Sequence, residues 1–251
     1  MEKTRIYGRK HNICSENTRN FYNERARKIE EMSCPYTAVL LADQNPEIAE
    51  QWDVFEKQIM LPKINIDGNS KVLDIGCGMG RLAEVIIPIS GYYCGIDYSE
   101  EMIKLAKKRC CFKRDKYDFI NASFQEAVGN PKRLHGVRFN RVIVSGVCMY
   151  INDFDMDNCV RNLLRNLDEK CILYLKETVA LQERLTLDRH PSAALKTSYD
   201  VIYRTAQEYL DYYQVFLENG FEIKAHGYLP NVNKGKEYSE TERWHAILQR
   251  D

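Results

Sequence analysis

The chain has 251 residues, and its 36 Lys and Arg residues balance its 36 Asp and Glu residues to a formal net charge of zero. This balance gives no electrostatic reason to expect a nucleic acid or an anionic membrane as a partner, and no apolar run approaches the ~20 residues of a membrane span. The nine cysteines show no C-x-x-C pair and no metal-ligand spacing, so we expect reduced thiols, no metal site and a cytoplasmic location.

Two amphipathic helices are predicted before the first strand. Residues 15–32 carry apolar side chains at helical spacing. A second helix is predicted to start at Pro46, after Asn45 as its cap. Its apolar stripe consists of Ile48, Trp52, Phe55 and Ile59. We expect residues 1–14 to be loose and residues 1–68 to form a helical cap on an α/β domain of residues 69–251.

A short apolar run that ends in three alternating glycines follows this cap. Residues 72–75 read as a buried strand, and Gly76, Gly78 and Gly80 come directly after it. Glycine permits a sharp turn and lets a ligand lie against the peptide units, where no Cβ is in the way. The predicted helix that begins here, and stops at Pro88, offers unpaired N–H groups at its N-terminus. The pattern therefore predicts a ligand at this turn.

Asp97 ends the next apolar run and follows Gly76 by 21 residues. An acidic residue about 20 positions past such glycines is placed to bind the two hydroxyls of a ribose. A helix should follow, because Ser99 can cap it and residues 107–109 place basic side chains in its last turn. Together, the glycines and Asp97 predict a nucleoside-containing cofactor.

Charge selects among the nucleoside cofactors. The carboxylate of Asp74, two residues before the first glycine, would oppose the pyrophosphate of a dinucleotide. S-adenosylmethionine instead carries a sulfonium and an ammonium, which a carboxylate stabilises. The glycine spacing is G-x-G-x-G, whereas the nicotinamide fingerprint needs a glycine at the position of Arg81. S-adenosylmethionine is therefore the expected cofactor.

These two segments resemble the class I S-adenosylmethionine-dependent methyltransferases. Asp74–Gly80 is similar to their first motif and Gly95–Met102 to their second. The family usually has an acidic residue near position 123 that contacts the adenine amino group, but this chain has Asn121-Ala122-Ser123-Phe124, so a hydroxyl or an amide must replace it. The resemblance, with the rule that ligands bind at the carboxyl ends of the strands, implies a cofactor site of Asp74, Gly76, Cys77, Gly78, Gly80, Asp97, Tyr98, Met102, Ser123, Phe124 and Ser145. Phe124 and Met102 could equally be core residues.

The rest of the chain alternates strands and helices. Strands are predicted at 117–120, at 141–145 with a continuation to 150, and at 171–176, with a helix at 153–167 between the last two. Such alternation favours a doubly wound, mostly parallel sheet. A capping box of Thr205 and Glu208 opens another helix, and two strands at 221–228 and 243–249 follow. The resemblance implies a seven-stranded sheet whose C-terminal strand is antiparallel. Residues 177–204 show no clean periodicity and are predicted to be a lid insertion after the fifth strand.

Methyl transfer requires alignment of the acceptor and removal of one proton. Candidates for the base or for orienting the acceptor are Glu177 at the end of the fifth strand, Tyr150 after the fourth, and His190 in the insertion. Candidates for binding the acceptor are Tyr22, Arg25, Tyr36, Tyr199, Tyr203 and Arg204. For each of these residues a structural role is the alternative.

The acceptor itself is only partly constrained. Nucleobase and glutamine amino-methyltransferases carry an Asn/Asp-Pro-Pro-Tyr run where this chain has Ser145–Cys148, which argues against both. We expect methyl transfer to an O or N atom of a small molecule, such as a sugar or a specialised metabolite. Three alternatives stay open: methyl transfer to a protein N-terminal amine, non-methylating chemistry such as cyclisation to an azetidine amino acid, and a role as a cofactor-binding partner without activity. A homodimer also stays open.

Overall fold

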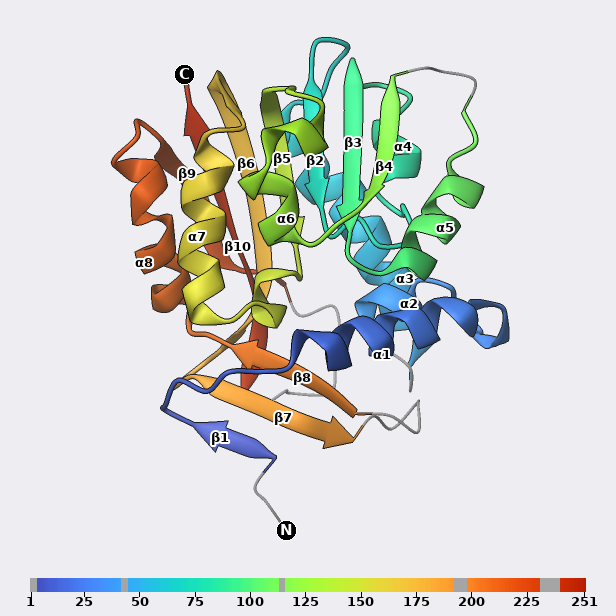
Figure 1. The fold of residues 1–251 in the computed structure, drawn as a ribbon, viewed down its shortest axis with the longest axis vertical. Coiled ribbons are helices and arrows are strands. Elements are labelled where there is room, and N and C mark those ends of the chain that lie inside the picture. The colour runs from blue at the N-terminus through green and yellow to red at the C-terminus, as the bar shows by residue number, and fades with distance from the viewer. Residues whose placement is uncertain (1–3, 42–44, 113–115, 192–197, 231–239) are drawn as a thin grey trace.

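The computed structural model describes residues 4–41, 45–112, 116–191, 198–230 and 240–251, which form two β-sheets and the helices around them (Figure 1). The strands are β1 (Arg5–Tyr7), β2 (Lys71–Ile75), β3 (Tyr92–Asp97), β4 (Tyr117–Asn121), β5 (Phe139–Ser145), β6 (Leu167–Ala180), β7 (Leu185–Pro191), β8 (Ser198–Tyr203), β9 (Glu222–Tyr228) and β10 (Thr241–Arg250). The α-helices are α1 (Ser15–Arg27), α2 (Thr37–Leu40), α3 (Pro46–Phe55), α4 (Ala83–Ile86), α5 (Glu100–Arg109), α6 (Phe124–Gly129), α7 (Asp153–Leu164) and α8 (Ala206–Leu217). Shorter helical turns are η1 (Ile29–Glu31), the π-helical η2 (Glu56–Met60), η3 (Leu61–Ile64), η4 (Pro131–Leu134) and η5 (Cys148–Tyr150).

The large sheet has seven strands in the order β4-β3-β2-β5-β6-β10-β9. Neighbours from β4 to β6 are parallel, whereas β10 is antiparallel to both β6 and β9. This confirms the predicted fold class. The strand order reverses beside β2, and in such sheets ligands bind at the carboxyl ends of the strands at that point.

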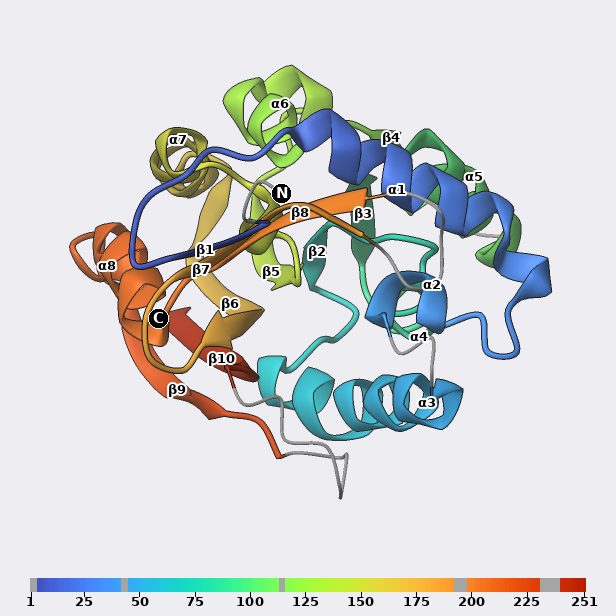
Figure 2. The same ribbon diagram turned by 90° about the horizontal axis from the view of Figure 1, so that it is seen from below.

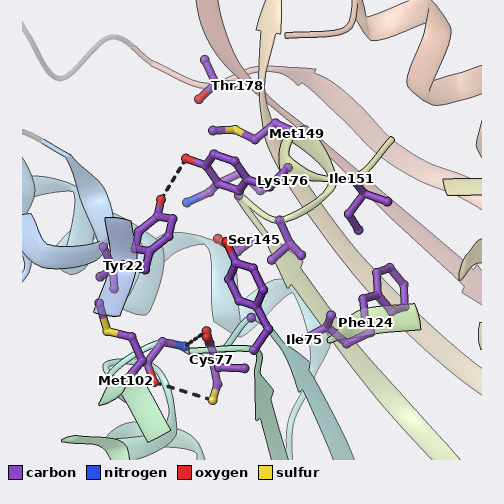
Figure 3. A pocket seen from close by; sticks show the side chains of 18 of the residues that line it. Tyr22, Ile75, Cys77, Met102, Phe124, Ser145, Met149, Ile151, Lys176 and Thr178 are labelled. Atoms are coloured by element: carbon purple, nitrogen blue, oxygen red, sulfur yellow. Dashed lines mark hydrogen bonds between the residues drawn. The ribbon is translucent and has the colours of Figure 1, made fainter. Parts of the chain in front are cut away.

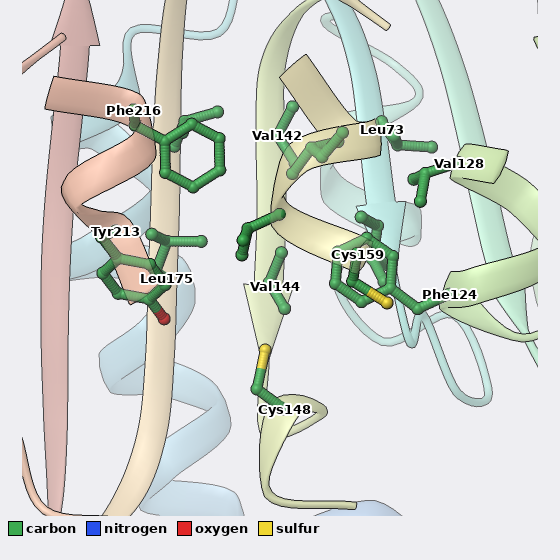
Figure 4. Close-up of a cluster of buried hydrophobic side chains, with 14 of the residues drawn as sticks. Leu73, Phe124, Val128, Val142, Val144, Cys148, Cys159, Leu175, Tyr213 and Phe216 are labelled. Atoms are coloured by element: carbon green, nitrogen blue, oxygen red, sulfur yellow. The ribbon is translucent and has the colours of Figure 1, made fainter. Parts of the chain in front are cut away.

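Helices cover both faces of the large sheet, because both faces of its central strands carry apolar side chains. Alternate residues such as Leu73 and Val144 face α6, α7 and α8 in one buried cluster (Figure 4). The opposite faces of the same strands meet α3, α4 and α5 in a second cluster. The same alternation along β6 puts successive residues of that strand on opposite faces of the sheet.

The predicted lid insertion is a second sheet rather than an aperiodic loop. The strands β7 and β8 pair antiparallel, and β1, from the segment expected to be loose, pairs with the other edge of β7. The strand β1 was not recognisable alone, because its partner β7 lies about 180 residues later in the chain. Figure 1 and Figure 2 show this small sheet and α1 together across one end of the large sheet. Residues 192–197, which the predicted lid also includes, lie outside the described residues.

Three local predictions were wrong. The fourth strand ends at Ser145, and residues 146–150 turn away into η5. The helix α3 starts at Pro46 as predicted, although Asn45 makes no side-chain cap bond. Its apolar stripe fails at Ile59, which is 50% exposed, because the wider π turn of η2 changes the helical phase and buries Glu56 and Met60 instead.

Candidate active site

A cavity of about 1280 Å³ lies between the large sheet and the cover formed by α1 and β8. It extends from the glycine turn after β2 to the ends of β6 and β10 (Figure 3). We call the part beside the glycine turn, β3 and β4 the cofactor end, and the part beside η5, β6, β8 and β10 the acceptor end.

The glycine turn is held against β3 by its backbone. The N–H groups of Gly76 and Cys77 both donate to the carbonyl of Ile96, over 2.8 and 2.9 Å. Gly76 and Gly78 have φ values of 72° and 53°, in the left-handed region that favours glycine. A Cβ on Gly76 would lie 2.2 Å from Cγ2 of Val147, so this position also needs the missing side chain. The turn leaves the backbone of Gly76–Gly78 in the cavity wall.

Asp97 closes the cofactor end. Its Oδ2 accepts a hydrogen bond from the Gly78 N–H over 3.0 Å, and its Oδ1 accepts one from the Ser99 N–H over 2.8 Å. Burial raises the pKa of this carboxyl to about 6, and the two backbone donors oppose that rise. Each oxygen keeps a lone pair for a further donor, which is the arrangement that two vicinal hydroxyls need.

Asp74 lines the same end of the cavity from β2. Its Oδ2 accepts a hydrogen bond from the Tyr93 hydroxyl over 2.7 Å. Burial raises its pKa to about 6, so a cation placed beside it would stabilise the ionised form. This is the charge preference that the sequence predicted for this corner.

The other cofactor candidates mostly line this end. Tyr98, Met102 and Phe124 border it, and the Ser123 hydroxyl accepts from the Glu126 N–H in the capping box of α6. Ser145 lines the wall towards the acceptor end. Gly80 does not line the cavity: a Cβ there would lie 3.2 Å from Cα of Ala106, so its role is close packing against α5.

Four tyrosines border the acceptor end. The hydroxyl of Tyr22 on α1 (labelled in Figure 3) lies 2.8 Å from that of Tyr150 in η5, and Tyr199 and Tyr203 line the cavity from β8. Burial raises the pKa of Tyr22 to about 12 and that of Tyr150 well above its ordinary value. These hydroxyls are therefore neutral at physiological pH and can orient an acceptor by hydrogen bonding.

Glu177 is buried but does not reach the cavity. Its carboxylate accepts backbone N–H bonds from Val147, Cys148 and Met149 over 3.1, 2.9 and 3.4 Å. The reason is the alternation of β6: Lys176 and Thr178 line the cavity, and the residue between them points to the opposite face. Burial raises the pKa of Glu177 to about 7. The residue supports η5, and the prediction of a base in the cavity was wrong for it.

Four further candidates lie outside the cavity lining. Arg204 is fully buried and donates to the carbonyls of Cys148 and Ile151 and to Asp153. Arg25 donates to the carbonyls of Ala38 and Thr37 and so holds α2 against α1. The ring of Tyr36 packs under the cations of Lys57 and Arg109. His190 packs its ring against Tyr199, with the centroids 5.9 Å apart. Each has a structural role at its position.

A charged network under the acceptor end was not predicted. The buried carboxylate of Glu56 accepts from Lys176 Nζ over 2.8 Å and from Ser145 Oγ over 2.9 Å, and it pairs with Arg81. These cations hold the pKa of Glu56 well below its usual range, although burial alone would raise it. Thr178 and Arg243 also line the acceptor end. The sequence offers one signal for them, their position: Lys176 ends the predicted fifth strand and Arg243 begins the predicted last strand, but no motif marks either residue.

Within the described residues, no group of three His, Cys, Asp or Glu side chains is placed to hold a metal ion. Over the same residues, no helix is both long and apolar enough to cross a membrane.

Comparisons with known proteins agree with this geometry. Residues 66–247 match the family model described as "Methyltransferase domain". The chain is 24% identical over 167 residues to phosphoethanolamine N-methyltransferase 1 of Caenorhabditis elegans, a match that covers 66% of this chain and 32% of that protein. The chain thus spans about a third of the length of this curated relative.

Solved structures of methyltransferases share the fold. An S-adenosylmethionine-dependent methyltransferase of Leishmania major superposes with a TM-score of 0.64 and 14% identity, over 96% of each chain. Phosphoethanolamine N-methyltransferase 1 of Haemonchus contortus, solved with phosphoethanolamine and S-adenosylhomocysteine, gives 0.67 and 15%, over 94% of this chain and 50% of that one. Magnesium protoporphyrin IX methyltransferase of Synechocystis PCC 6803, with bound cofactor, gives 0.59 and 16%, over 94% and 97%. At these identities the similarity shows the fold alone.

Proposed function

This chain belongs to the methyltransferase domain family, and from that membership and its cavity we propose that it transfers a methyl group from S-adenosylmethionine to an O or N atom of a small molecule. S-adenosylmethionine, when bound, supplies the activated methyl group and an adenosine to hold it in place.

The residues of the cofactor end fit this molecule. Asp97 offers two carboxylate oxygens, already fixed by backbone donors, to the ribose hydroxyls. Gly76 and Gly78 let the ligand lie against the backbone, and Asp74 provides negative charge near the cationic part of the molecule. Met102 and Phe124 offer apolar surface for the adenine.

The observation that carries the proposal is the continuity of the cavity. Its volume of about 1280 Å³ exceeds the ~300–1,000 Å³ typical of a site for one small ligand, so a cofactor and an acceptor fit together. The acceptor end begins where the cofactor end stops and is covered by α1 and β8. This enclosure favours a small molecule.

The acceptor end supplies orientation rather than a strong base. The paired hydroxyls of Tyr22 and Tyr150 can donate to and accept from an acceptor group. Alignment and exclusion of water are then the main contributions of the protein, which suits methyl transfer to a nucleophilic N or O atom. The cap of residues 1–68 and the insertion of residues 177–204 are proposed to enclose the acceptor together.

Chromatography of the nucleoside products tests this proposal. Purified protein is incubated with S-adenosylmethionine and pools of small amines, sugars, phosphoesters and carboxylic acids. We expect S-adenosylhomocysteine to accumulate with at least one pool and not with a reference peptide that bears a free N-terminal amine. Accumulation of methylthioadenosine without an added acceptor, and without S-adenosylhomocysteine, would instead indicate chemistry on the aminobutyrate chain and refute methyl transfer.

A further inference from the structure

The network under the acceptor end contains more cations than carboxylates. Its members are linked by ion pairs: Asp53 pairs with Lys57 and Arg81, Glu56 with Arg81 and Lys176, and Glu84 with Lys57 and Arg109. Among the residues that the structure describes, four cations therefore share three carboxylates. Lys176 is the member at the acceptor end, where its side chain is 7% exposed and lines the cavity.

A second cation lies next to Lys176 on the same sheet face. In the register of the sheet, Lys176 pairs with Ser145 of β5, and Thr178, two residues further along β6, pairs with Arg243 of β10. Alternation along each strand puts these four residues on one face, and all four line the cavity (Figure 3 shows Ser145, Lys176 and Thr178). Arg243 is held in place with its guanidinium 4.1 Å from the ring centroid of Trp52.

The charges that face Lys176 leave it partly uncompensated. The pKa of Lys176 is lowered to about 8, because burial, Arg81 and Arg243 together outweigh the opposing effect of Glu56. Glu242 also lines the cavity, but strand alternation assigns it to the other face of β10. An anion placed between the buried Lys176 and the half-buried Arg243 would stabilise both cations.

The position of this face separates it from the cofactor end. The glycine turn follows β2, whereas Lys176 lies two strands away on β6 and Arg243 three strands away on β10. Ser145, on β5, stands between the two ends of the cavity. The cation pair therefore faces the acceptor rather than the ribose or the adenine.

We propose that Lys176 and Arg243, with the hydroxyls of Ser145 and Thr178, form a subsite for a carboxylate or phosphate group of the acceptor. The inference rests on the proposed function and narrows its substrate class to anionic small molecules. The anion fixes one end of the acceptor and leaves its nucleophilic atom free to lie towards Tyr22 and Tyr150. These four are specificity residues, and none of them is assigned the proton transfer.

Calorimetry on the full chain saturated with S-adenosylhomocysteine tests the subsite. The probes are inorganic phosphate, succinate and uncharged glycerol. We expect saturable binding of phosphate or succinate and none of glycerol, and at least a tenfold loss of that binding in both Lys176→Met and Arg243→Gln. The preferred probe distinguishes a phosphate from a carboxylate. Lys224→Gln, which removes an exposed cation from β9, is the matched control and should bind the anions as the unchanged chain does.

Three results would overturn the inference. If the unchanged chain binds S-adenosylhomocysteine but neither anion, the subsite does not exist and the proposed function stands. If both variants lose S-adenosylhomocysteine affinity instead, the cations serve the cofactor's own carboxylate. If Lys224→Gln weakens anion binding as much as Arg243→Gln does, the attraction is a general surface effect. Arg243 is not one of the ion-paired residues of the network, so the Arg243→Gln variant keeps the test decisive even if the Lys176→Met variant does not fold. Failure of the unchanged chain to bind S-adenosylhomocysteine would refute the proposed function itself.

Discussion

Replacing Asp97 by alanine should separate cofactor binding from folding. The carboxylate accepts one backbone N–H on each oxygen, from Gly78 and Ser99, and has one lone pair per oxygen left for the ribose. Alanine removes both of these acceptors and leaves the glycine turn with one fewer anchor. The change therefore acts on the cofactor end without touching the acceptor end.

The expected magnitude follows from the two lost hydrogen bonds. A hydrogen bond to a charged group contributes ~1.5–3 kcal/mol, so two at the lower value give about 3 kcal/mol. Since about 1.4 kcal/mol is a tenfold change in Kd, the affinity for S-adenosylhomocysteine should fall more than about 100-fold. Calorimetric titration measures this Kd directly, and the melting curve of the ligand-free variant shows whether it is folded.

The pH dependence of ligand affinity is a second test of the role of Asp97. Burial raises the pKa of Asp97 to about 6, so its ionised form is lost as the pH falls through about 6. Ligand affinity should accordingly be constant above about pH 7 and weaken below about pH 6. Asp97→Asn should make this dependence shallower without abolishing it, because Asp74 also titrates at about 6. The stability of the ligand-free protein depends on pH in the opposite direction. Because the carboxyl pKa is raised in the folded chain, Asp97 contributes to the free energy of unfolding at low pH, and this contribution is lost as the pH rises through about 6.

Unchanged affinity in a folded Asp97→Ala protein would refute the assignment of this carboxylate to the ribose. Selective binding of a nicotinamide dinucleotide by the unchanged chain would refute the choice of cofactor as well.

Two further predictions concern the support of the site and its cover. Above about pH 7, where Glu177 is ionised, Glu177→Gln should lower the free energy of unfolding by about 1–3 kcal/mol, because three backbone N–H groups lose a charged acceptor. The rate of methyl transfer should stay within about tenfold of that of the unchanged chain. A ~100-fold loss of rate in a protein of unchanged stability would restore Glu177 as the base. Binding of S-adenosylhomocysteine together with an acceptor should increase hydrogen-exchange protection in β8 and α1, since both line the cavity. Complete protection in the free protein would show that the cover is a fixed wall.

Local pattern alone was enough to predict a cofactor site after the first strand of the large sheet. The pattern consists of three glycines, Asp74 before them and Asp97 after them, all within about 25 residues of sequence. The chemistry of the turn depends only on backbone conformation and one carboxylate. The same holds for the alternating strands and helices of the large sheet, because each element carries its own periodicity. The predicted sheet and the membership of the methyltransferase family are confirmed, whereas the residues assigned to the cofactor stay predictions.

The acceptor end was decided by tertiary structure. Glu177 occupies the position expected of a base, yet strand alternation and the turn of the chain into η5 point it away from the cavity. Lys176 and Arg243 carry no recognisable motif, and they meet only because β10 inserts antiparallel beside β6. The cover exists because α1 packs against β8, about 180 residues later, where Phe21 contacts Tyr199 and the Thr18 hydroxyl donates to the carbonyl of Asp200. Long-range pairing of this kind leaves little trace in local periodicity. The sequence by itself therefore determined the fold class, the family and the expected cofactor, and only the folded chain decided which side chains line the acceptor end of the cavity.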